Sequence, residues 1–194
     1  MDLTVLGVLE FNSIAVGIKA LDAMVKAAAI RVVDTKTVCP GKYIVIITGE
    51  LAAVDASLTA GKETGQGHLI DELFIPNLHK QIIPAIKGTA GCTSWGALGV
   101  IESFSVTASI EAGDIAAKEA EIQIPEIRLA MGIGGKSYVK LVGSIEAVEA
   151  AMRAGVEYIR GKGLLCQEII IPKAHPDIKP FFCNIRPEGY EPWK

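Results

Sequence analysis

The chain has 194 residues, of which 50% are hydrophobic, and it has a formal net charge of -3 and a mean hydropathy of +0.38. The negative charge and the lack of a dense Lys/Arg stripe argue against nucleic-acid binding. No uncharged apolar stretch reaches the roughly 18 residues of a membrane helix, and Asp2 and Glu10 interrupt the first apolar run, so we expect no secretory signal. We expect the surplus apolar surface at subunit interfaces.

The first half of the chain begins with a short apolar strand at 6–10, followed by a helix that Ser13 can cap. We expect this helix to face the core with Ile14, Ile18, Leu21, Met24, Val25 and Ala28. The later elements are a strand at 31–38, a turn at 39–42, a strand at 43–48, a second helix opened by Gly49, a strand at 69–75 and a short helix at 79–86. The β-α-β-β-α-β order predicts an α+β, ferredoxin-like fold.

The second half of the chain repeats the first. Segment 6–30 matches segment 98–122 at nearly half of its positions, with a constant offset of 92 residues. The offset grows to 94 at Gly41/Gly135 and to 96 at His79/His175, as two small loop insertions would produce. We therefore predict a first domain at 1–87, a linker at 88–96, a second domain at 97–182 and a C-terminal tail at 183–194.

Several motifs favour structural over catalytic interpretations. The glycine-rich run at 132–136 invites a phosphate-loop interpretation, but a strand and no helix follows it, which favours a hairpin turn. His79 and His175 are equivalent in the repeat and suit helix capping, and Glu10 and Glu102 fall in separate cores. No catalytic constellation can be assembled, so we expect no enzyme.

The four cysteines show no CxxC spacing, and a cytosolic context favours free thiols. Cys39 breaks the repeat, because the second copy has only Gly and Ile in the equivalent loop. One thiolate holds neither zinc nor an iron–sulfur cluster. The residues alone leave two interpretations open, an inert exposed thiol or, if the loop lies on a threefold axis, one of three thiolates around a point.

The two copies resemble the shell domain of bacterial microcompartments, the BMC domain. The motifs that carry this resemblance in the first copy are LGVLEFNSIAVGIKALDAMVKAA, CPGK, YIVIITGELAAVDASL and IPNLH. Those of the second copy are LGVIESFSVTASIEAGDIAAK, GIGGKSYVKLVGSIEAVEAAM and IPKAH. The loop KTVCPGK is similar to that of the T-type shell proteins of propanediol utilisation.

The resemblance implies a homotrimer that mimics a hexamer and tiles edge to edge with other shell proteins, in a microcompartment shell in the cytoplasm. It implies that Cys39 of three chains binds a [4Fe-4S] cluster, with redox enzymes inside the shell as candidate partners. The implied pore lining is Val38, Pro40, Gly41, Gly132, Ile133, Gly134 and Gly135. The implied shell-edge contacts are Lys26 and Lys118, beside Asp22 and Asp114.

Three hypotheses follow. The first is a structural shell trimer whose pore cluster transfers electrons across the shell. The second is a shell trimer with a metal-free pore for metabolites. The third is a ferredoxin-like enzyme or small-molecule sensor.

Overall fold

The structure is a computed structural model and describes residues 4–183. It divides into two compact units. Unit 1 is 1–80 with two short segments of the second repeat, 105–107 and 129–136, and unit 2 is the remainder. Among the described helices, none is long and apolar enough to cross a membrane. Of the predicted tail, only Cys183 belongs to the described residues.

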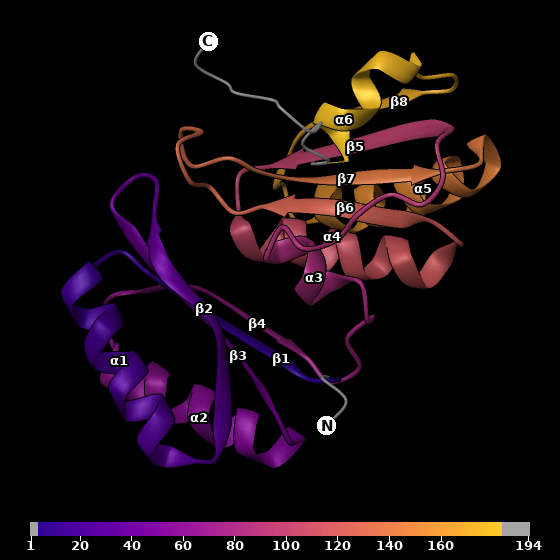
Figure 1. Cartoon of the computed structure of the whole chain (residues 1–194). Coiled ribbons are helices and arrows are strands. Elements are labelled where there is room, and N and C mark those ends of the chain that lie inside the picture. Colours follow the sequence, from indigo (N-terminus) through magenta and orange to yellow (C-terminus); the bar gives the residue numbers. More distant parts are fainter. Residues whose placement is uncertain (1–3, 184–194) are drawn as a thin grey trace, which may run out of the picture. The chain divides into compact units, whose positions relative to one another are not determined.

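Unit 1 has one four-stranded sheet with two helices on one of its faces (Figure 1). Its elements are β1 (Leu6–Phe11), α1 (Ile14–Ala27), β2 (Ile30–Val38), β3 (Lys42–Gly49), α2 (Leu51–Thr64) and β4 (Leu69–Ile75). The strand order is β2-β3-β1-β4, and β3 is antiparallel to both β1 and β2. Strands β1 and β2 therefore run parallel with β3 between them, which is the split βαβ arrangement that the sequence predicted.

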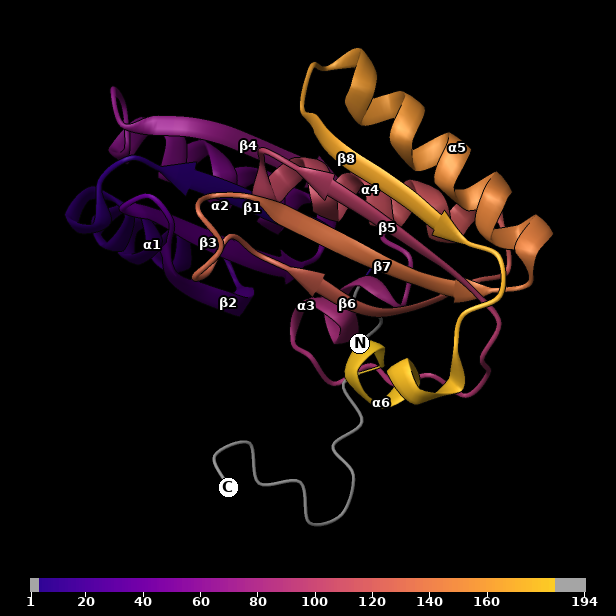
Figure 2. The same ribbon diagram turned by 90° about the horizontal axis from the view of Figure 1, so that it is seen from above.

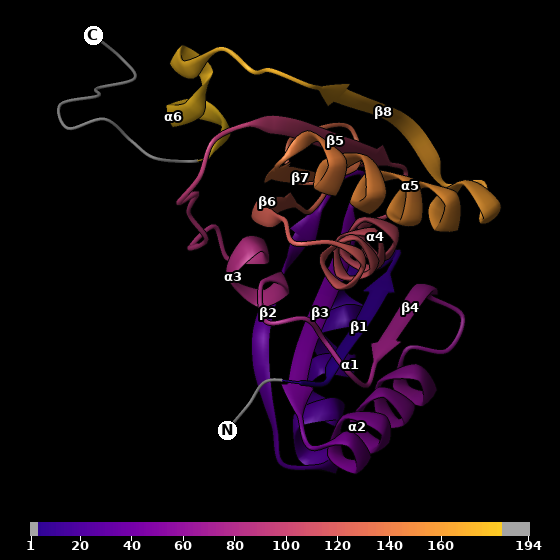
Figure 3. The same cartoon turned by 90° about the vertical axis from the view of Figure 1, so that its right-hand side faces the viewer.

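Unit 2 repeats this plan, with the strand order β6-β7-β5-β8 (Figure 2). Its elements are α3 (Ile82–Ile86), β5 (Ala97–Ser103), α4 (Val106–Glu119), β6 (Gln123–Arg128), β7 (Ser137–Gly143), α5 (Ile145–Gly161), β8 (Leu165–Ile171), the 3-10 helix η1 (Pro176–Ile178) and α6 (Lys179–Phe182). Helices α4 and α5 cover one face of the sheet, and α6 lies on the opposite face (Figure 3). The α+β, ferredoxin-like prediction is confirmed for both repeats.

The core face of α1 differs from the prediction. Of the six residues expected there, Ile14, Ile18 and Val25 are exposed, and the buried residues of the helix are Gly17, Ala20 and Met24. A Cβ at Gly17 would lie 2.5 Å from a ring carbon of Tyr43. The small residues let α1 approach the sheet closely, and this rotates the larger apolar side chains outward.

The helix termini confirm part of the capping predictions. The Ser13 side chain accepts a hydrogen bond from the Val16 N–H, and His175 Nδ1 accepts one from the Asp177 N–H in η1. His79 does not cap α3, which starts three residues later than expected and has no side-chain cap. Gly49 ends β3 and does not open α2.

The prediction of four free thiols is wrong for two of them. Cys92 in the linker is bonded to Cys183 at the end of α6, with 5.6 Å between their Cα atoms. Cys39 and Cys166 are free. The sequence carried no signal for this bond, because only the folded sheet brings the two residues together.

Candidate functional site

The loop between β2 and β3 presents the free cysteine that breaks the repeat. Val38 is buried at the end of β2, Cys39 is half-buried, and Pro40 and Gly41 lie at the tip, where Gly41 is exposed. Gly41 has φ 71°, a left-handed conformation that favours glycine. The tight turn thus places the half-buried Cys39 next to the exposed tip of the loop.

The second predicted pore loop, between β6 and β7, lies beside this one within unit 1. The Cys39 N–H donates to the Ala130 carbonyl over 2.9 Å. A Cβ at Gly135 would lie 3.4 Å from the Cys39 carbonyl oxygen. Positive φ angles occur at Ala130, Gly132, Gly134 and Gly135. The structure therefore brings the two loops together, and the left-handed φ of 84° at Gly135 explains the glycine there.

The loops of one chain cannot hold a metal centre alone. Cys39 contributes one free thiol, and within residues 4–183 no group of three or more His, Cys, Asp or Glu side chains could bind a metal ion. An iron–sulfur cluster needs several thiolates. The residues present fit such a cluster only if other chains bring their own Cys39 to the same point.

A buried ion pair stands at the base of the first loop. Lys42, the first residue of β3, pairs with the carboxylate of Glu10 on β1, whose side chain is 2% exposed. Both residues recur in the second repeat as Glu102 and Lys136. Glu10 is thus engaged in a structural contact. Lys42 was not among the predicted site residues, although its recurrence together with the glutamate was visible in the sequence.

The predicted shell-edge residues form two equivalent ion pairs with different exposure. Lys26 Nζ lies 2.6 Å from Asp22, and their side chains are 72% and 60% exposed. Lys118 Nζ lies 2.5 Å from Asp114, whose side chain is only 6% exposed. Lys26 and Asp22 are therefore open to a neighbouring molecule, whereas Asp114 is covered within the chain.

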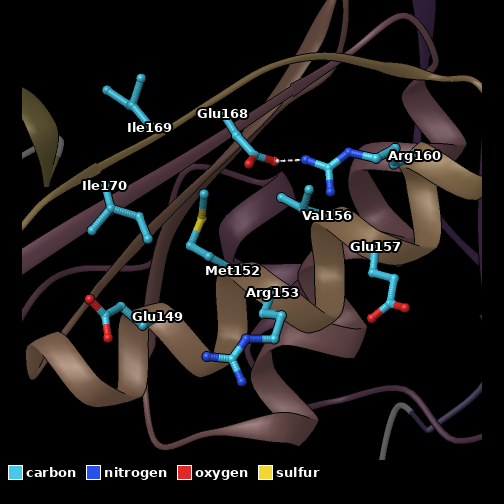
Figure 4. Close-up of a pocket in the computed structure, with 9 residues that line it drawn as sticks. All are labelled: Glu149, Met152, Arg153, Val156, Glu157, Arg160, Glu168, Ile169 and Ile170. Atoms are coloured by element: carbon cyan, nitrogen blue, oxygen red, sulfur yellow. Dashed lines mark hydrogen bonds and ion pairs between the residues drawn. The ribbon is translucent and has the colours of Figure 1, made fainter.

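A groove of about 740 Å³ lies between α5 and the edge strand β8 (Figure 4). Its apolar lining consists of Met152, Val156, Ile169 and Ile170, and its charged lining consists of Glu149, Arg153, Glu157, Arg160 and Glu168. An ion pair of 2.9 Å joins Arg160 to Glu168 across it. None of the predicted site residues lies in this groove.

Beside α6, the face of the second sheet carries a polar cluster. Lys140 Nζ lies 2.7 Å from the Glu126 carboxylate, and the Tyr138 hydroxyl donates to the same carboxylate over 3.2 Å. Burial, and then the negative charge of Glu126, raise the pKa of Tyr138 to about 12. The position equivalent to Tyr138 in the first repeat is the fully buried Ile44.

Comparisons with known proteins agree with this tandem architecture. The family model of the BMC domain matches the chain twice, at residues 5–78 and 97–174. The bacterial microcompartment shell protein PduT of Citrobacter freundii is 36% identical over 170 residues, which is 88% of this chain and 92% of that protein. The carboxysome shell protein CsoS1A of Hydrogenovibrio crunogenus is 35% identical over 85 residues, which is 42% of this chain and 88% of its own length.

A solved structure extends the agreement to three dimensions. The crystal structure of a microcompartment protein from Desulfitobacterium hafniense matches with a TM-score of 0.86 and 44% identity, covering 92% of this chain and 99% of that one. The family match covers more than half of the chain, and both repeats have the same sheet order. The chain belongs to the BMC-domain family of bacterial microcompartment shell proteins and carries that domain twice in tandem.

Proposed function

We propose that the chain is a non-enzymatic shell subunit whose homotrimers tile with other shell proteins, and that three Cys39 thiolates at the trimer's central pore bind a [4Fe-4S] cluster. The observation that carries the assembly is an exposed apolar stripe on α1 whose equivalent on α4 is buried. The relatives are named as shell components, which supports a microcompartment shell as the location of the proposed trimer.

The stripe consists of Ile14, Ile18 and Val25, which are 40%, 52% and 44% exposed. The repeat pairs these residues with Val106, Ile110 and Ala117, which are 0%, 0% and 8% exposed. Because these side chains are already about half buried, covering the exposed part of each would contribute about 1 kcal/mol. Because the equivalent residues on α4 are buried, we expect the exposed stripe on α1 to be buried in the same way, against a second chain.

One polar contact indicates how that partner is recognised. Within unit 1, the Asp71 carboxylate on β4 accepts hydrogen bonds from the hydroxyls of Ser105, over 2.8 Å, and Thr107, at the start of α4. The repeat pairs Asp71 with Gln167 on β8, and Ser105 with Ser13 at the start of α1. We expect Gln167 of one chain to meet Ser13 of the next. Such head-to-tail contacts form a ring when the rotation from chain to chain closes, and in the proposed trimer three chains give a ring of six repeats.

The support for the cluster is the asymmetry of the pore loops. A ring of six repeats would alternate the Cys39 loop with the glycine loop, so it would offer three thiols in place of six. Thiolates are the ligands that iron–sulfur clusters require, and an exposed cluster with three protein ligands supplies one-electron chemistry. Electron transfer across the shell to redox enzymes inside it is the corresponding role.

The test is iron and sulfide analysis of anaerobically purified protein, together with its mass in solution. We expect three times the chain mass of 20.5 kDa and about four iron and four sulfide atoms per trimer. Cys39→Ala should lose the iron and sulfide and keep the trimer. Cys166→Ala is the matched control, since Cys166 is the other free, half-buried cysteine, and it should keep both.

The outcomes separate the hypotheses. A trimer without iron or sulfide would leave the metal-free pore for metabolites as the function. Iron retained by the Cys39→Ala protein would refute the assigned ligand. A monomer at all concentrations would refute the shell trimer and favour a sensor or enzyme, for which the groove between α5 and β8 would be the first place to look.

A further inference from the structure

The bond between Cys92 and Cys183 joins two parts of unit 2 that are far apart in sequence, separated by 91 positions. Cys92 belongs to the linker between the repeats and is half-buried, whereas Cys183 directly follows α6 and is 1% exposed. Nothing in the repeat requires this bond, because Cys183 is equivalent to Lys87 in the first copy. It is therefore a feature of the second repeat alone.

Helix α6 lies on the sheet face opposite α4 and α5 (Figure 3). The disulfide ties its end to the linker, over an apolar patch on that face. Phe182 meets the ring of Trp95 edge-on, with 6.2 Å between centroids, and the Trp95 indole N–H donates to the Ala174 carbonyl. Lys140 Nζ lies 5.1 Å above the Phe182 ring and donates to the Phe182 carbonyl over 3.2 Å. Ala174, with Leu98 and Val142, forms the buried part of this cluster.

These contacts alone are a weak anchor. Helix α6 has four residues, far fewer than the 12–15 or so at which an isolated helix becomes even marginally stable. Its residue Phe181 is 64% exposed and contributes little burial. The position of α6 therefore depends on the covalent bond more than that of a long amphipathic helix would.

The equivalent helix α3 is anchored differently. The Gln81 side chain donates to the Ile122 carbonyl over 2.8 Å and accepts from the Ile124 N–H over 2.9 Å, which fixes α3 to the edge strand β6. The linker to β5 then continues the chain from its far end. The repeat pairs Gln81 with Asp177, whose backbone N–H is instead bound by His175. The disulfide replaces an anchor that the second copy lacks.

We propose that Cys92 and Cys183 are a thiol-sensitive clasp: oxidised, they hold α6 on the patch of Leu98 and Val142, and reduced, they let α6 open. Intracellular disulfides are rare and are commonly redox-sensing. A reducing dithiol would attack the more exposed sulfur, that of Cys92, and displace Cys183 as a thiolate. Its second thiol would then resolve the mixed disulfide. Two electrons and two protons pass to the protein, and the dithiol leaves as a cyclic disulfide.

The clasp closes again by the reverse exchange with a low-molecular-weight disulfide. It does not depend on the proposed pore cluster, because Cys39 belongs to unit 1 and takes no part in the exchange. What it changes is access to one face of the second sheet, including Lys140 and the Trp95 side chain.

The first test measures the bond in protein purified without reductant. Iodoacetamide is added to the denatured chain before and after reduction by dithiothreitol, and the labelled peptides are identified by mass spectrometry. We expect Cys39 and Cys166 to react at once and Cys92 and Cys183 to react only after reduction. Immediate labelling of all four cysteines would overturn the proposal.

The second test measures the opening of α6 by chymotrypsin cleavage beside Phe182 in the native protein. We expect reduction to accelerate this cleavage by at least about ten-fold. Cys92→Ser should be cleaved at the fast rate with or without dithiothreitol, and Cys166→Ser should keep the dependence of the wild type. Equal cleavage of oxidised and reduced wild-type protein would show that the bond does not control α6.

Discussion

Equivalent surfaces of the two repeats have different environments although their folds agree. The outer residues of α1 are exposed, and their equivalents on α4 are buried. The β2–β3 loop carries Cys39-Pro40, and the β6–β7 loop carries Ile133-Gly134 at the equivalent positions. After the duplication, the first copy has thus kept this helix face exposed, whereas the second copy has it buried. The duplication has also allowed a thiol to be present in every second loop of the proposed six-repeat ring.

The largest expected effect tests the open face of α1. Ile18→Glu places a charge on the exposed stripe. If the stripe is buried in the trimer, the cost of removing this charge from water should weaken association at least about 30-fold. This corresponds to an interface residue that contributes about 2 kcal/mol. Mass in solution across a concentration series measures this. Leu51→Glu is the control, because Leu51 on α2 is equally exposed, at 52%. Equal loss of the trimer in both variants would show that the exposed stripe on α1 is not the specific trimer interface.

A smaller effect is expected where the repeats differ in packing between helix and strand. Gly17 on α1 faces Tyr43, whereas the equivalent residues of the second repeat are Ser109 and Ser137. Gly17→Ser would force a side chain against Tyr43, because the new Cβ would stand only 2.9 Å from the Tyr43 Cβ. The substitution should cost about 2 kcal/mol of unfolding free energy. Denaturant titration measures the loss.

The reverse substitution supplies the control for this pair. Ser109→Gly removes the 2.9 Å hydrogen bond between the Ser103 and Ser109 hydroxyls and weakens α4, at a cost of about 1 kcal/mol. A loss as large as that of Gly17→Ser would show that helix propensity, and not the close approach of Tyr43, decides the identity of residue 17.

These packing details explain which parts of the fold and of the candidate site could be predicted from the sequence. Alternating and helical periods predicted the strands and their ferredoxin-like order, because tertiary contacts reinforce those patterns in both copies. The same helical period misassigned Ile14 and Ile18 to the core, since apolar residues recur in the same way whether they face a core or a partner. The Cys92–Cys183 bond left no local pattern at all. The role of Cys39 stays a prediction, because it depends on how this chain assembles with other copies of itself.

The next prediction tests the hydrogen bonds between Asp71 and the start of α4, whose equivalent is expected between the chains of the trimer. Asp71→Ala removes the acceptor for Ser105 and Thr107, and because hydrogen bonds to a carboxylate are stronger than neutral ones, we expect a loss of about 2 kcal/mol in the unfolding free energy. Glu72→Ala is the matched control. Its side chain is 53% exposed and pairs with Lys62, so its loss should stay within about 0.5 kcal/mol. Equal losses would argue against using Asp71 as the guide to Gln167.

The smallest effect concerns the polar face of the second sheet, where Tyr138 replaces the Ile44 of the first. Burial and Glu126 raise the pKa of Tyr138 to about 12, above the value near 10 of an unfolded chain. Between these values the folded chain binds more protons than the unfolded one, so stability falls as pH rises from about 10 to about 12. Tyr138→Phe should make this fall less steep, and the phenolate absorbance of the wild type minus that of the variant should give the midpoint. A midpoint near 10 would mean that Tyr138 is more open to water, and less coupled to Glu126, than its hydrogen bond indicates.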